Sequence, residues 1–189
     1  MRRSMRRQDI SKVSVDRWFC CGFEDSVVQV QLHVFCDTSE AAYGSTAYFR
    51  FSFKSGGHAC RFALAKSKLS PIKAVTLARL EFTAALTGVR MYKMLIHETD
   101  LPVEKVYFWT DSTLTLQYIR NTTQRLKAYV ANRKTEINEA TDPDDWRHIP
   151  GELNPADLLT RGVTNPAQLM ECNTHGTSGS SLWGSSPSE

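Results

Sequence analysis

The stretch VYFWTDSTLTLQYI, residues 106–119, joins a run of apolar and aromatic side chains to a helical pattern. Residues Val106 to Thr110 are typical of a buried strand, yet this strand ends on a carboxylate, Asp111. A buried carboxylate costs free energy unless a cation, a metal ion or hydrogen-bond donors compensate its charge. Asp111 is therefore either a cap of the following turn or part of a charged site.

The rest of the chain places this strand fourth of five. Three strands precede it and are joined by short turns, which predicts an antiparallel meander. The fourth and fifth strands are each reached through helices, so we expect them to pair in parallel beside the first strand. The pattern predicts an α/β fold with a mixed five-stranded sheet, three strands antiparallel and two parallel, and helices on both faces. The predicted strands span 28–37, 42–54, 58–69, 103–111 and 144–149, and the helices about 73–97, 112–120, 124–140 and 155–161.

Composition indicates one domain, predicted over residues 28–162. The chain has 189 residues, of which 41% are hydrophobic and 23% charged, enough for a single core. The start MRRSMRRQDI is arginine-rich but no apolar segment follows, so residues 1–27 are expected to form a basic arm rather than a secretory signal. Residues 163–189 are rich in Ser, Thr, Gly and Asn and predict a flexible tail. No apolar run approaches the roughly 18 residues of a membrane span, so no membrane partner is expected.

Charge and cysteine content narrow the functional classes. A net charge of +3 and a pI near 8.6 allow a nucleic-acid partner without requiring one. The five cysteines are odd in number and include no C-x-x-C pair, which argues against a disulfide framework or a zinc site. Reduced thiols are expected at Cys20, Cys21, Cys36, Cys60 and Cys172.

Two further carboxylates are predicted to face inward. Asp37 ends the first strand as Asp111 ends the fourth, and the carboxyl ends of neighbouring strands are where ligands bind in open sheets. Glu81 lies opposite the polar stripe of the long helix, in line with positions expected to be buried: Leu77, Ala84, Gly88 and Met91. Three converging carboxylates predict a site for a hard divalent cation, Mg²⁺ or Mn²⁺.

Each of these carboxylates also has a structural interpretation. Asp37 and Asp111 could cap the turns that follow their strands, and Glu81 could form an ion pair with Arg79 or Lys73. A fourth acidic residue belongs to PGELNPADLLTRG, residues 150–162.

In that segment Asn154 is a suitable N-cap and Pro155 suits the first helical position. Asp157 then falls at the third position, where a carboxylate favours the helix dipole. Spacing alone therefore favours a capping role for Asp157.

Four stretches match a known family in order: LHVFCDTSEAAYGSTAYFR, AKSKLSPIKAVTLARLEFTAAL, VYFWTDSTLTLQYI and WRHIPGELNPADLLTRG. Together they cover about residues 31–162. They resemble the type I ribonuclease H domain of long-terminal-repeat retroelements, most closely the BEL/Pao group.

The resemblance implies a two-metal nuclease whose acidic tetrad is Asp37, Glu81, Asp111 and Asp157. Asp37 would bridge two Mg²⁺ or Mn²⁺ ions. Asp157 would share the ion that activates the attacking water, and Glu81 and Asp111 would complete the ion that stabilises the leaving 3′ oxygen. By this resemblance Asp157 is a ligand as well as a cap.

The implied substrate is the RNA strand of an RNA–DNA hybrid, selected through 2′-hydroxyls and backbone shape. The implied partner is the reverse transcriptase domain of the same polyprotein. Candidate nucleic-acid contacts are Thr38, Ser39 and Ser112 beside the metals, and Arg125, Lys127, Arg133 and Lys134 on the penultimate helix. A solvated helix face is the alternative for the second set.

Two features depart from the family pattern. Many relatives carry a histidine in a loop before the last aspartate, whereas PGELN leaves no room for that loop and His148 lies earlier, on a strand. Turnover is expected to be slower, with metal binding intact. Ala78 stands where relatives often have proline before Arg-Leu-Glu, a small change at the helix start.

Three rival functions compete with this assignment, and the first of them is disfavoured. CDTSE and WTDSTL resemble the paired motifs of an aspartic peptidase, but Ser39 replaces the expected glycine and Glu81 would have no role. The chain could be an inactive or domesticated element fragment that only binds nucleic acid. It could also be an integrase or transposase core, which uses a similar acidic site on DNA ends.

Overall fold

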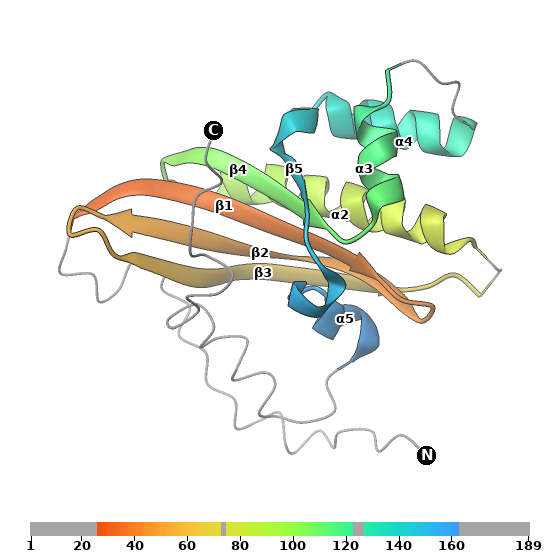
Figure 1. Cartoon of the computed structure of the whole chain (residues 1–189), viewed down its shortest axis with the longest axis horizontal. Coiled ribbons are helices and arrows are strands. Elements are labelled where there is room, and N and C mark those ends of the chain that lie inside the picture. Colours follow the sequence, from red (N-terminus) through yellow and green to blue (C-terminus); the bar gives the residue numbers. More distant parts are fainter. Residues whose placement is uncertain (1–25, 73–74, 123–126, 163–189) are drawn as a thin grey trace.

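The computed structural model describes residues 26–72, 75–122 and 127–162. The predicted tail, Arg125 and nearly all of the predicted arm lie outside these ranges, although Val27 already belongs to the first strand. The described residues form one five-stranded sheet in the order β3-β2-β1-β4-β5 (Figure 1). The strands are β1 (Val27–Thr38), β2 (Ala42–Phe53), β3 (His58–Leu69), β4 (Val103–Thr110) and β5 (Trp146–His148).

Strand pairing confirms the predicted mixed sheet. β1 pairs antiparallel with β2, and β2 with β3, while β1–β4 and β4–β5 are parallel. Short turns join the first three strands, and Gly56 adopts the positive φ of 92° that one of these turns requires. The parallel pairs need crossover connections, and the helices between β3, β4 and β5 supply them.

Helices cover both faces of the sheet, as the sequence predicts. Figure 1 shows the short last helix below the sheet and the other helices above it. No helix in the described ranges has the length and apolar character to span a bilayer. The helices are α2 (Leu77–Glu98), α3 (Thr113–Arg120), α4 (Ala128–Asn138) and α5 (Asp157–Arg161), with 3₁₀ turns η1 (Pro143–Asp145) and η2 (Gly151–Leu153).

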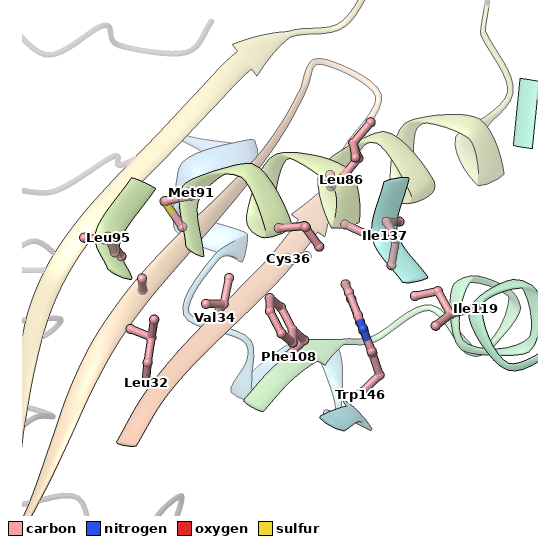
Figure 2. Close-up of a cluster of buried hydrophobic side chains, with 14 of the residues drawn as sticks. Leu32, Val34, Cys36, Leu86, Met91, Leu95, Phe108, Ile119, Ile137 and Trp146 are labelled. Carbon is pink, nitrogen blue, oxygen red and sulfur yellow. The ribbon is translucent and has the colours of Figure 1, made fainter. Parts of the chain in front are cut away.

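The main core lies between the sheet and the three upper helices. Alternate residues of β1, Leu32, Val34 and Cys36, point toward α2 (Figure 2). The ring of Phe108 on β4 stacks on Trp146 of β5 with centroids 4.7 Å apart. Of the cysteines in the described residues, Cys36 and Cys60 are buried and free, in line with the expected reduced thiols.

Candidate active site

Asp37 and Asp111 lie at the same end of two adjacent parallel strands. Cys36 of β1 pairs with Thr110 of β4, so the two aspartates directly follow paired residues. Neighbouring strands are about 4.8 Å apart, which brings the two residues into electrostatic range. Asp37 is 5% exposed and Asp111 is half-buried. The carboxylate that ends the fourth strand therefore has a second carboxylate beside it.

Asp157 is brought to this end by α5. Asn154, just before the helix, donates from Nδ2 to the Cys36 carbonyl oxygen at 3.0 Å, and its Oδ1 accepts from the Ala156 amide at 3.1 Å. Thr160, within the helix, donates through its hydroxyl to Asp37 Oδ2. The helix starts at Asp157 rather than at 155, because Pro155 and Ala156 lie in a turn between η2 and the helix. Asp157 thus lies in the first turn of α5, one residue after the position that caps it.

Glu81 approaches from α2 and is half-buried. Its Oε2 accepts a 2.5 Å hydrogen bond from the Ser112 hydroxyl, next in the chain to Asp111. Within the described residues Glu81 forms no ion pair, and Lys73, one suggested partner, lies outside them. The inward stripe predicted for α2 is correct at Ala84, Gly88 and Met91 but wrong at Leu77, which is 50% exposed on the first turn of the helix.

Burial and neighbouring negative charge raise the proton affinity of Asp37 and Asp111. The pKa of Asp37 is raised to about 6, mainly by burial and in part by the charges of Asp111 and Asp157, while the Thr160 hydrogen bond opposes the rise. Burial followed by the charge of Asp157 also raises the pKa of Asp111. Arg161 offsets part of this charge through a 2.5 Å ion pair with Asp157. The site therefore carries negative charge that its own residues only partly neutralise.

The donor chemistry suits a hard divalent cation, because all the groups are carboxylate oxygens. Among the described residues, however, no group of three or more His, Cys, Asp or Glu side chains is arranged so that it could hold a metal ion. Three of the carboxylates already have partners within the chain: Arg161 binds Asp157, Ser112 binds Glu81 and Thr160 binds Asp37. The arrangement is one of neighbouring carboxylates that repel one another rather than a closed cage.

The predicted nucleic-acid contacts divide into two groups. Near the acids, the Ser39 hydroxyl donates to the Thr160 carbonyl oxygen at 2.8 Å, and Thr38 donates within its own turn. The Ser112 hydroxyl is taken by Glu81. In this structure all three hydroxyl groups donate hydrogen bonds to acceptors within the protein.

The second group lies on the helical layer, at α4. Lys127 is exposed. The Arg133 guanidinium lies over the Tyr129 ring, 3.6 Å from its centroid, and Lys134 donates to the Asn121 carbonyl oxygen. Arg133 and Lys134 are therefore not simply solvated, because the charged end of each side chain contacts another group of the protein.

Sequence reasoning missed three contributors to this site. The sequence pattern predicts Asn154 only as a helix cap and predicts no role for Thr160 or Arg161. Thr160 and Arg161 follow Asp157 by three and four positions, the spacing that places side chains on one helix face. That spacing is a signal for the Arg161–Asp157 ion pair, but the partner of Thr160 on β1 cannot be read from it.

The fold defines an α/β domain of ribonuclease H-like type. A family model described as the Pao retrotransposon-like RNaseH-like domain matches residues 2–112, more than half of the chain. The chain therefore belongs to this family of Pao-type retrotransposon domains. The matched region contains Asp37, Glu81 and Asp111, and ends before Asp157.

No curated protein sequence gives a significant match to the chain. Among solved structures, RNase H1 from Halobacterium salinarum NRC-1 is 12% identical with a TM-score of 0.44, covering 76% of this chain and 98% of that one. The N-terminal RNase H domain of a Mycobacterium tuberculosis protein is 10% identical with a TM-score of 0.45, covering 78% and 96%. LC11-RNase H1, isolated from compost and solved with an RNA/DNA hybrid, is 13% identical with a TM-score of 0.46, covering 74% and 99%.

Proposed function

We propose that this chain is a divalent-metal-dependent endonuclease that cleaves the RNA strand of RNA–DNA hybrids. The observation that carries the proposal is the meeting of Asp37, Asp111 and Asp157, from three distant segments, at one end of the sheet in an RNase H-like domain. Mutual repulsion between them disfavours folding, and a bound cation would relieve it. The same cation would also take part in catalysis.

The acidic residues would hold Mg²⁺ or Mn²⁺. We assign Asp37 to both of two ions, Asp157 to one of them, and Glu81 with Asp111 to the other. Bound metal would supply an activated water and stabilise charge at the scissile phosphate. The chain's own contribution is orientation: Ser112 fixes Glu81, and the short helix α5 carries Asp157 to β1.

The proposed substrate follows from the retroelement family. Reverse transcription produces RNA–DNA hybrids, so the reverse transcriptase domain of the same polyprotein is the proposed partner. Thr38 and Lys127 stay candidate contacts for the sugar–phosphate backbone. Arg133 and Lys134 would add positive charge to the helical layer while keeping their internal contacts.

The test compares wild type with Asp111→Asn on labelled RNA–DNA hybrid, duplex DNA and duplex RNA, with Mg²⁺, Mn²⁺ or EDTA. We expect metal-dependent cleavage of the hybrid alone, and a loss of at least about 100-fold in Asp111→Asn with the fold intact. Asp100→Asn is the matched control, because Asp100 is an exposed aspartate in the loop before β4. It should cleave as wild type does.

Each rival function predicts a different outcome. Hybrid binding without cleavage would identify an inactive nucleic-acid-binding fragment. Cutting at DNA ends would indicate an integrase or transposase core, and pepstatin-sensitive, EDTA-resistant proteolysis a peptidase. Hybrid cleavage by Asp111→Asn at the wild-type rate would exclude the assignment of the acidic site.

A further inference from the structure

Three hydrogen bonds join the segment carrying Asp157 to the end of β1. Asn154 Nδ2 donates to the Cys36 carbonyl oxygen at 3.0 Å, and the Ser39 hydroxyl donates to the Thr160 carbonyl oxygen at 2.8 Å. The third bond differs in kind because both partners are side chains: the Thr160 hydroxyl donates to Asp37 Oδ2, across 123 positions of the sequence. The backbone on both sides of this bond is thus already fixed by the other two.

The Thr160 hydroxyl has one proton and two acceptors within reach. Its oxygen lies 3.1 Å from the Asp157 carbonyl oxygen, one turn back in α5, and closer to the Asp37 carboxylate. A hydroxyl donates its single proton to one acceptor at a time. A charged acceptor gives the stronger and shorter bond, so the proton belongs to Asp37. Thr160 is 3% exposed and Asp37 5% exposed, which shields the bond from competing water.

This bond acts against a force that would otherwise move the carboxylate. Asp111 and Asp157 both place negative charge beside Asp37. The Thr38 backbone amide also hydrogen-bonds to this carboxylate, and Thr160 adds the side-chain bond that resists the repulsion. With Oδ2 held by Thr160, the plane of the carboxylate is set and its other oxygen has a defined direction.

We propose that Thr160 is a positioning residue for Asp37, which fixes the carboxylate in the orientation that binds a divalent cation. The inference rests on the proposed metal-dependent function and adds to it a residue outside the acidic tetrad. Groups that hydrogen-bond to a metal ligand typically change metal affinity by about 10–100-fold when they are removed. Thr160 should therefore affect metal affinity more than the rate at saturating metal.

The experiment uses the full 189-residue chain and three variants: Thr160→Val, Thr160→Ala and Thr160→Ser. Valine keeps the shape and removes the hydroxyl. Serine and alanine both lack the γ-methyl and differ only in the hydroxyl, so this pair decides the question even if the valine variant does not fold. The readouts are the Mn²⁺ dissociation constant from titration of the protein without nucleic acid, and hybrid cleavage as a function of Mg²⁺ concentration.

We expect the Mn²⁺ dissociation constant to rise about tenfold or more in Thr160→Val and Thr160→Ala, and to stay within about threefold of wild type in Thr160→Ser. The Mg²⁺ concentration for half-maximal cleavage should shift in the same way, with cleavage at saturating Mg²⁺ nearly restored. Equal Mn²⁺ affinity in the serine and alanine variants would overturn the proposal, whether both match wild type or both lose affinity. A wild-type chain that neither binds Mn²⁺ nor cleaves hybrid would instead overturn the proposed function, and this inference with it.

Discussion

The Ser112 hydroxyl makes two hydrogen bonds that serve different purposes. It donates to Glu81 Oε2 at 2.5 Å and accepts from the Thr115 amide at 3.1 Å, as the N-cap of α3. One side chain therefore stabilises the helix that follows β4 and orients a carboxylate on α2. The two roles can be separated by mutation.

Ser112→Ala should lower the free energy of unfolding by about 1–2 kcal/mol, because the N-cap bond is lost. Glu81→Gln leaves that cap in place and should change stability by less than about 0.5 kcal/mol. Hybrid cleavage should fall in both variants. Urea unfolding followed by circular dichroism measures the first effect, and a Ser112→Ala variant as stable as wild type would show that the cap contributes little.

Gly88 lets α2 pack closely on β1, and its replacement tests this contact. A Cβ at Gly88 would lie 2.6 Å from Cys36 Sγ and 3.1 Å from Val34 Cγ1, both in the buried core. Alanine would gain up to about 1 kcal/mol in helix propensity but cost about 1–3 kcal/mol in overpacking.

Since 2.6 Å requires a core side chain to move, we expect Gly88→Ala to be destabilising by about 1 kcal/mol or more in urea unfolding. Gly57→Ala is the control, because its Cβ would meet only Phe53 at an ordinary 3.8 Å. It should leave stability within about 0.5 kcal/mol of wild type. A stabilised Gly88→Ala would mean that propensity outweighs the close contact.

The strand order and the meeting of Asp37 and Asp111 could be predicted from the sequence because both follow from short-range patterns. Alternation and turns define the strands, and the crossover rule places the fourth beside the first. A carboxylate at the end of each strand then fixes which end of the sheet is charged. The family resemblance, rather than spacing, was needed to place Asp157 with them.

The rest depends on contacts that local patterns do not encode. The bonds from Asn154 and Thr160 to β1 span 118 and 123 positions. Leu77 fits the inward stripe of α2 by periodicity but lies on the first turn of the helix and is exposed. Arg133 and Lys134 are predicted from the sequence as phosphate contacts or, alternatively, as part of a solvated face. In the structure they contact a neighbouring ring and a carbonyl oxygen.

The metal-free protein should lose stability as pH rises through the titration of Asp37. Burial first, and then Asp111 and Asp157, raise its pKa from the usual 3.8 to about 6. Between these values the folded state binds more protons than the unfolded state, so its stability falls as pH increases and then levels above about pH 6. Asn can still accept from Thr160, so Asp37→Asn should gain on the order of 1–2 kcal/mol at pH 7.

The measurement is urea unfolding in EDTA from pH 4 to 8 for both proteins. The difference in unfolding free energy between Asp37→Asn and wild type should grow from pH 4 to pH 6 and then stay constant. A difference that does not change with pH would show that Asp37 titrates normally in the fold.

His33 should have the opposite effect on acid stability. Its Nδ1 accepts a 3.1 Å hydrogen bond from Trp109 Nε1, an indole N–H that only donates, so that nitrogen must be unprotonated. Burial, aided by the Arg50 charge, lowers the pKa of His33 from 6.5 to about 3. Between these values the unfolded state binds more protons, and stability falls as pH decreases, by up to about 1.4 kcal/mol per pH unit.

His33→Phe keeps a ring beside Tyr107, whose centroid is 5.1 Å away, and removes the titration. It should be less stable than wild type at pH 7 by about 1–2 kcal/mol, because the Trp109 N–H loses its acceptor. Its deficit should shrink and then reverse as pH falls from 6.5 toward 4. His97→Gln is the control, since 84% of the His97 side chain is exposed, and its difference from wild type should show no such reversal. A His33→Phe deficit that stays constant from pH 7 to pH 4 would mean that the histidine becomes protonated within the folded protein.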